Sequence, residues 1–259
     1  MNYGLYLSAS GVLTNSYRQD VFANNLANVN TVGFKPDLPV ITARPAEAIE
    51  DHSPFGTANA LLDRLGGGVL AGPQRTSFAP APVEQTGRDL DVAFTDATSF
   101  LAVQDIDPNT GEASVRLTRD GRLGVDGHGF VVTATGHRVL GNNDRPISVQ
   151  PGVKLTVTGD GRLQQDGSEV GQLQVATVAD TTQLQKAGAN LFAFAGNDPR
   201  SRNDSPNLRV GALESSGTNA IRTMMAVMAS GRASQSNGRM IQHHDQMMDR
   251  TVNTFGRVA

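Results

Sequence analysis

The chain has 259 residues, of which 38% are hydrophobic, and it contains 28 glycines and 12 prolines but no cysteine. This balance favours a turn-rich, largely β body over a compact α/β enzyme, and the lack of cysteine excludes disulfides, thiolate catalysis and cysteine-based zinc sites. The 22 basic and 25 acidic residues are spread along the sequence, and the net charge of −3 argues against nucleic acid or an anionic membrane as a partner.

A helix over about residues 2–30 is the first predicted element. The segment contains no proline, and its apolar residues recur at helical spacing over a sector wider than a single stripe. Gly33 and Pro36 stop the helix soon afterwards. The segment lacks the basic start and uninterrupted apolar run of a cleaved secretory signal, so we expect none. No apolar stretch approaches the ~20 residues that a membrane-crossing helix needs.

Residues from about 36 to 212 form the second predicted region, which is rich in β-strands. Short alternating or β-branched runs recur there and are separated by turns of Gly, Asn, Asp and Pro. Two similar octapeptides, DGRLGVDG at 120–127 and DGRLQQDG at 160–167, each predict a turn, a very short strand and a turn. The predicted strands span residues 89–94, 100–104, 115–118, 130–134, 155–158, 173–178 and 191–195.

A second long helix is predicted over about residues 217–256, which contain no proline and six of the seven methionines. Methionine is flexible and polarizable, and it suits surfaces that pack against several non-identical neighbours. Gly231 and Gly238 bracket a stretch of small residues, which either permits a close helix approach or weakens and kinks the helix. Two helices with such wide apolar sectors cannot bury themselves completely against each other. We therefore expect burial between subunits.

Catalytic and metal-binding motifs are not evident in this sequence. His243 and His244 are followed by Asp245, but adjacent side chains diverge on a helix, whereas metal-binding pairs stand three or four residues apart. The sequence contains no phosphate loop of the G-K-S/T type and no G-x-S-x-G nucleophile elbow. We expect no enzyme, no cofactor and no metal site.

Four segments are similar to those of a known protein family, the bacterial flagellar axial proteins of the rod, hook and hook-associated types. Residues 24–35, NNLANVNTVGFK, closely resemble the family's N-terminal signature. Residues 86–93, TGRDLDVA, look like the segment that opens its β domain, and residues 117–121, LTRDG, look like one of its hairpins. Residues 211–216, GALESS, resemble the entry to its last helix. The length argues for a rod protein, since hook subunits usually carry an additional outer domain.

The resemblance implies an α+β fold in which long N- and C-terminal helices form an α-helical, coiled-coil-like domain and the middle of the chain is β-rich. We divide the chain accordingly. Residues 1–35 and 213–259 form a terminal helical assembly domain, residues 36–85 an extended linker or hinge, and residues 86–212 a β-rich domain.

The resemblance also implies a function: a structural subunit of the basal-body rod that self-assembles into the axial tube and transmits motor torque. The expected partners are further copies of the chain, neighbouring rod and hook subunits, and the flagellar type III export apparatus, with no nucleic acid and no transmembrane segment. The expected location is the periplasm-spanning rod. A hook or hook-associated protein is the alternative within the family, and an extracellular β-module that binds cell-wall polysaccharide is the alternative from another class.

The assembly interface is expected on the two terminal helices and on the signature that follows the first of them. The amides of the signature asparagines can serve two purposes, since they can cap the helix end or fix the register of a neighbouring subunit. The candidate interface residues are Leu5, Ala9, Val12, Val21, Asn24, Asn25, Leu26, Asn28, Thr31, Gly33, Phe34, Ile221, Met224, Met228, Ile241, Met248 and Val252.

Overall fold

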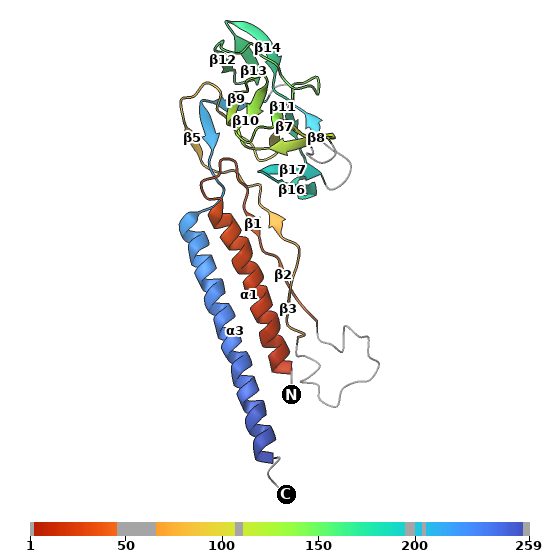
Figure 1. Ribbon diagram of the computed structural model, residues 1–259, viewed down its shortest axis with the longest axis vertical. Helices are drawn as coiled ribbons and strands as arrows, with labels where there is room; N and C mark the ends of the chain where they lie inside the picture. The colour runs from red at the N-terminus through yellow and green to blue at the C-terminus, as the bar shows by residue number, and fades with distance from the viewer. Residues whose placement is uncertain (1–2, 46–65, 107–110, 195–199, 204–205, 256–259) are drawn as a thin grey trace. The chain divides into compact units, whose positions relative to one another are not determined.

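The computed structural model describes the chain outside residues 1–2, 46–65, 107–110, 195–199, 204–205 and 256–259. It confirms the predicted α+β class, with an N-terminal helix, a β-rich middle and a C-terminal helix (Figure 1). The chain forms two compact units. The helical unit comprises residues 1–27, 37–75 and 220–259, and the β unit comprises residues 28–36 and 76–219.

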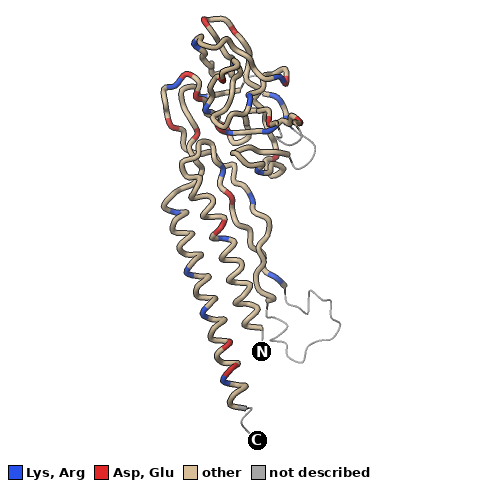
Figure 2. Tube along the Cα trace, in the orientation of Figure 1, with Lys and Arg blue, Asp and Glu red and all other residues tan. Residues whose placement is uncertain are grey.

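Two helices dominate the helical unit: α1 (Tyr3–Ala27) and α3 (Ala220–Phe255). They run side by side in opposite directions (Figure 1). Charged residues are sparse on α1, which carries only Arg18 and Asp20, whereas they recur along α3 (Figure 2). α3 continues through Gly231 and Gly238 as one helix, and a Cβ on Gly231 would lie 3.7 Å from Gln19 Oε1 of α1. This distance is an ordinary van der Waals contact, and the stretch of small residues does not interrupt α3.

Extended segments lie along α1 in the same unit (Figure 1). They contain β1 (Asp37–Leu38), β2 (Ile41–Ala43) and β3 (Val69–Ala71), and β4 (Arg75–Thr76) straddles the boundary to the β unit. β2 and β3 pair antiparallel. Tyr17 Oη of α1 donates to the Gly72 carbonyl at 3.0 Å, and the Val69 amide donates to Ser10 Oγ at 3.3 Å. The segment that contains β3 is thus attached to the helix at Val69 and Gly72.

The β unit is built from short antiparallel strands. In the described part of the chain, its largest sheet has the order β16-β17-β8-β7-β11-β10-β9, and β15 pairs with both β7 and β18. β12, β13 and β14 form a further sheet, and β6 pairs with β19 and β5 with β20. The bounds are β5 (Val83–Gln85), β6 (Val92–Phe94), β7 (Ser99–Ile106), β8 (Ala113–Thr118), β9 (Leu123–Val125), β10 (Val131–Thr133), β11 (Arg138–Val139), β12 (Leu155–Val157), β13 (Arg162–Gln165), β14 (Ser168–Gln172), β15 (Val175–Thr177), the 3₁₀ helix η2 (Thr181–Gln183), β16 (Leu184–Gly188), β17 (Leu191–Phe194), β18 (Ser201–Arg202), β19 (Leu208–Val210) and β20 (Ala212–Glu214).

Strand β7 is buried on both faces and divides the core in two. Leu101 and Val103 point into one cluster of aliphatic side chains, and Phe100 and Ala102 point into the other. This division follows from the two-residue period of a strand, which sends successive side chains to opposite faces. Phe78, Phe100 and Phe192 meet edge to face in the second cluster, with ring centroids 5.2–5.9 Å apart.

Each predicted strand overlaps an observed one, and residue 195, the end of the last predicted strand, lies outside the described residues. The two similar octapeptides also behave as predicted. The first contains β9, which forms a hairpin with β10, and the second contains β13, which pairs with β12 and β14. The predicted helices are slightly longer than the observed ones. Residues 28–30 leave α1 in a turn that is closed by a hydrogen bond from the Thr31 amide to the Asn28 carbonyl, at 3.2 Å.

Candidate functional site

The large apolar side chains of α3 lie mostly at the surface of the chain. Ile221 is 75% exposed and Val252 68% exposed. Methionines fill the stretch between them. We call this set the methionine face: Ile221, Met224, Met225, Met228, Met240, Met247, Met248 and Val252, each at least 39% exposed.

Small and polar residues, in contrast, form the seam between α1 and α3. A Cβ on Gly4 would lie 2.7 Å from the ring of His244, and one on Gly11 would clash with the amide of Asn237. Ser230 is buried and donates to the Ala226 carbonyl of its own helix at 2.8 Å. The two helices approach closely because glycine leaves room at the contact. This arrangement is the reverse of an ordinary amphipathic pair, which turns its largest apolar side chains inward.

Helix α1 contributes fewer exposed apolar side chains. Of the candidate residues, Leu5, Ala9, Val12 and Leu26 are half-buried and Val21 is buried. Sequence reasoning did not select Tyr6 and Leu13, which are 69% and 72% exposed. Both line a hollow of about 470 Å³ between α1 and the β3 segment, together with Tyr3, Ala9, Ser10, Arg44, Gly67, Val69 and Leu70.

Asn25 is buried and uses its amide inside the chain. Its Nδ2 donates to the Asp37 carbonyl at 2.7 Å, and its Oδ1 accepts from the Asp37 amide at 2.9 Å. The side chain therefore binds both backbone groups of one residue and holds the extended segment at the end of α1. Asn24 is exposed, and Asn28 accepts at Oδ1 from Thr31 Oγ1 at 3.1 Å.

Replacing Asn25 with leucine is expected to release the segment around Asp37 from α1. The change removes two buried hydrogen bonds, each worth about 0.5–1.5 kcal/mol, and it leaves the Asp37 backbone groups without these partners. Hydrogen exchange of the Asp37 amide should accelerate roughly 10-fold or more, because about 1.4 kcal/mol corresponds to a factor of ten. Asn30→Leu, at an exposed position of the following turn, is the control. Unchanged exchange at Asp37 in Asn25→Leu would contradict the role of this amide.

The rest of the signature, residues 28–36, belongs to the β unit. Phe34 is buried, and Lys186 Nζ lies 4.2 Å from the centroid of its ring. Gly33 has a φ of +67°, and a Cβ there would clash with the Arg119 carbonyl, so both the conformation and the close approach require glycine. Val21, Asn25, Gly33 and Phe34 are thus buried within the chain itself.

Two segments of the β unit, one that follows α1 in the sequence and one that precedes α3, are hydrogen-bonded to each other. We call residues 31–36 the entry connector and residues 213–218 the exit connector. The Gly33 amide donates to the Glu214 carbonyl at 2.7 Å, and the Gly217 amide donates to the Phe34 carbonyl at 2.9 Å. The connectors also pack tightly, since a Cβ on Gly217 would lie 2.8 Å from Pro36 Cδ.

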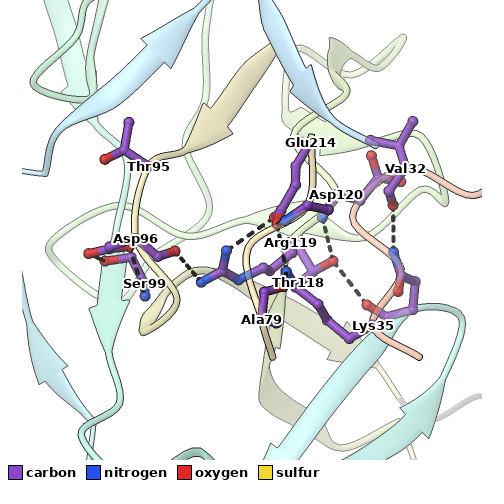
Figure 3. A network of polar contacts seen from close by, with 12 residues as sticks. Val32, Lys35, Ala79, Thr95, Asp96, Ser99, Thr118, Arg119, Asp120 and Glu214 are labelled. Carbon is purple, nitrogen blue, oxygen red and sulfur yellow. Dashed lines mark hydrogen bonds and ion pairs between the residues drawn. The ribbon is translucent and has the colours of Figure 1, made fainter. Parts of the chain in front are cut away.

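A buried cluster of three charged side chains lies at the connectors (Figure 3). Lys35 Nζ lies 2.6 Å from Glu214 Oε1, and Arg119 NH1 lies 3.1 Å from Glu214 Oε2. The three side chains are no more than 1% exposed. Burial lowers the pKa of the Lys35 ammonium, and its hydrogen bond to Glu214 opposes this shift. The cluster holds two cations for one carboxylate.

Backbone groups supply further hydrogen bonds to this cluster. Lys35 Nζ also donates to the Ala79 carbonyl at 2.9 Å, and the Ala81 amide donates to Glu214 Oε1 at 3.0 Å. Arg119 NH2 donates to the Asp96 carbonyl at 2.6 Å (Figure 3). The Arg119 guanidinium carbon lies 4.8 Å from the centroid of the Phe100 ring, which supplies a cation–π contact.

Lys35, Arg119 and Glu214 occur in three separate sequence motifs, and none of the motifs indicates a role for the charged side chain. The available signal was a charged residue in each motif, which follows an apolar residue at Lys35 and at Glu214. Only the fold brings the three together, since 179 residues separate Lys35 from Glu214 and 95 separate Arg119 from Glu214.

In the part of the chain that the structure describes, His, Asp and Glu side chains do not gather in threes around a possible metal position. Over the same residues, no helix has the length and apolar character to span a membrane.

Comparison with known proteins places these features in a family. The model of the "Flagella basal body rod protein" family matches residues 5–35, and that of the "Flagellar basal body rod FlgEFG protein C-terminal" matches residues 209–254. The two matches contain Lys35 and Glu214, the connector residues of the ion cluster.

Relatives extend the similarity over the whole chain. The flagellar basal-body rod protein FlgF of Caulobacter vibrioides is 30% identical over 262 residues, which cover all of both chains. FlgG of Bacillus subtilis is 28% identical over 96% of this chain and 97% of its own length, and FlgF of Escherichia coli is 29% identical over 95% of each. Taken with its fold, its surfaces and its motifs, this similarity shows that the chain belongs to the flagellar basal-body rod protein family.

Proposed function

We propose that this chain is a structural, non-enzymatic subunit of the bacterial flagellar basal-body rod, and that it assembles through the outward surfaces of its two terminal helices. Family membership supports the rod assignment, and the names of the relatives describe parts of the flagellum. The observation that carries the mode of assembly is the reversed helix pair. Its seam is closed by small and polar residues, while the methionine face stays exposed.

The energetics favour an intersubunit role for this face. Burial of one Met or Ile side chain contributes about 1.5–3 kcal/mol. A single chain forgoes this gain at each of the exposed positions, and a neighbouring subunit that covers them recovers it. Methionine side chains adapt to surfaces of different shape, which suits a subunit that contacts copies of itself and related but non-identical neighbours. Tyr6 and Leu13 of α1 extend the apolar surface available for this purpose.

We further propose that α1 and α3 pack as a coiled-coil-like pair. The contacts support this packing because they recur every seven residues: Gly4 and Gly11 on α1 lie against His244 and Asn237 on α3. A seven-residue repeat keeps one seam of each helix facing its partner. In this proposal residues 1–35 and 213–259 act as the assembly domain, residues 36–85 as an extended linker or hinge, and residues 86–212 as the β-rich domain.

The proposed route to the rod is export through the flagellar type III apparatus, without a cleaved signal peptide, followed by addition to a growing tip. The absence of cysteine and the modest hydrophobic content support passage of an unfolded chain, since no disulfide has to be reduced and little core has to be undone. The subunit would then form part of the axial tube that crosses the periplasm and transmits torque.

Replacing Met224 and Met228 together with glutamine tests the assembly role. Glutamine preserves length and helix propensity, so the helix pair should keep its circular dichroism. Losing two buried side chains of about 1.5 kcal/mol or more each should raise the concentration needed for polymerisation by at least about 100-fold, as measured by light scattering.

The matched control is Val115→Gln with Val125→Gln, at positions of the β unit that are 37% and 38% exposed. This control should polymerise as the unaltered chain does. Polymerisation of the methionine variant at the unaltered concentration would refute the role of the face. Imaging of basal bodies from cells that express each variant compares their incorporation into the rod in the cell.

A further inference from the structure

We propose that Lys35, Arg119 and Glu214 form a clamp that keeps the entry and exit connectors paired, and that Lys35 is its positioning residue. Both connectors belong to the β unit and are its parts nearest in sequence to the helices, since α1 ends at Ala27 and α3 begins at Ala220. Pairing of the connectors is a property of the isolated chain, so it can be tested independently of the rod assignment and of polymerisation.

The contacts converge on one residue of the exit connector. Glu214 binds the entry connector twice, because its backbone carbonyl accepts from the Gly33 amide and its Oε1 accepts from Lys35 Nζ. Its Oε2 binds Arg119, and its Oε1 also accepts from the Ala81 amide. If the Glu214 side chain moved away, the buried charges of Lys35 and Arg119 would be left without a counter-ion in an apolar environment.

The charge balance of the cluster distinguishes the role of Lys35 from the roles of Arg119 and Glu214. Without Lys35, the remaining pair of Arg119 and Glu214 is neutral and keeps its contact at 3.1 Å. The β unit then loses the tie to the entry connector but not its buried charge balance. Loss of Lys35 is therefore expected to weaken the pairing of the connectors and to leave the two hydrophobic clusters on either side of β7 packed.

Hydrogen exchange of the Lys35→Met variant tests this inference. The amides of Gly33 and Gly217, which bridge the two connectors, should exchange about 100-fold faster or more, because the substitution removes the charged hydrogen bonds of Lys35 Nζ to Glu214 and to the Ala79 carbonyl. The Ala102 amide, which donates to the Gln174 carbonyl in the centre of the sheet, should change by less than about 3-fold. Lys154→Met is the matched control, because Lys154 forms an exposed pair with Asp89 at 2.7 Å.

A second variant perturbs the paired connectors without altering any charge. Gly217→Ala places a methyl group against Pro36 and should loosen the Gly33 and Gly217 amides selectively, as Lys35→Met does. The clamp is overturned if the two amides keep their protection in Lys35→Met. It is equally overturned if exchange of the Ala102 amide accelerates by the same factor, since Lys35 would then stabilise the whole β unit and not the paired connectors specifically.

Discussion

Glu214→Leu is expected to lower the free energy of unfolding of the β unit by about 3–5 kcal/mol. The substitution removes the single carboxylate that faces Lys35 and Arg119, so two buried cations remain without a counter-ion. It also removes the hydrogen bond and the charge that raise the pKa of Lys35, leaving the burial that lowers it. Because removing one partner of a buried pair costs more than the pair contributes, the loss should exceed that of Lys35→Met, which leaves a neutral pair.

Urea unfolding followed by circular dichroism of the β signal measures this loss. Tyrosine fluorescence is unsuitable, because the three tyrosines, at positions 3, 6 and 17, are all in the helical unit and the chain has no tryptophan. Glu169→Leu serves as the control. Glu169 pairs with Arg162 at 3.0 Å with both side chains about half exposed, and such surface pairs contribute about 0–1 kcal/mol. Equal losses in the two variants would contradict the importance of the buried cluster.

Phe100→Ala is expected to destabilise the β unit by about 3–5 kcal/mol as well. Phe100 is fully buried, and its ring contacts those of Phe78 and Phe192 with centroids 5.6 and 5.9 Å away. The change opens a cavity among these rings and removes the aromatic face under the Arg119 guanidinium. The same urea titration measures the result.

The control for Phe100 is Phe130→Ala in the same unit. The guanidinium carbon of Arg138 lies 4.4 Å from the centroid of the Phe130 ring, but that ring is only half-buried. Both variants lose a cation–π contact, and only Phe100→Ala loses a closed packing site. A loss in Phe130→Ala as large as that in Phe100→Ala would show that the guanidinium contact outweighs the packing.

The sequence predicted that α3 is rich in exposed methionine but did not predict which sector of the helix faces α1. The concentration of methionine between residues 217 and 256 indicated a surface for several neighbours. Helical spacing alone does not say which sector of a helix meets its partner, since α3 has small residues on one side and large apolar residues on another. The tertiary structure places Gly4 and Gly11 of α1 against His244 and Asn237 of α3, so a polar sector of α3 faces α1.

The signature asparagines show the opposite case, in which one residue type covers several roles. The sequence left open whether their amides cap the helix or set the register of a neighbour. Asn25 binds the backbone of Asp37, 12 residues further along, and this partner lies beyond the reach of any turn pattern. Asn24, on the same helix end, is exposed and stays a candidate for contact with a neighbour.

The sequence by itself determined the helices at both ends, the strands between them and the family, because each depends on local periodicity, on turn residues or on contiguous motifs. The tertiary structure alone decided which face of α3 is free and how Lys35, Arg119 and Glu214 meet. Helix and strand periods repeat within a few residues, whereas the ion cluster joins positions up to 179 residues apart. No local pattern encodes such a contact, and only the folded chain brings the charges to one place.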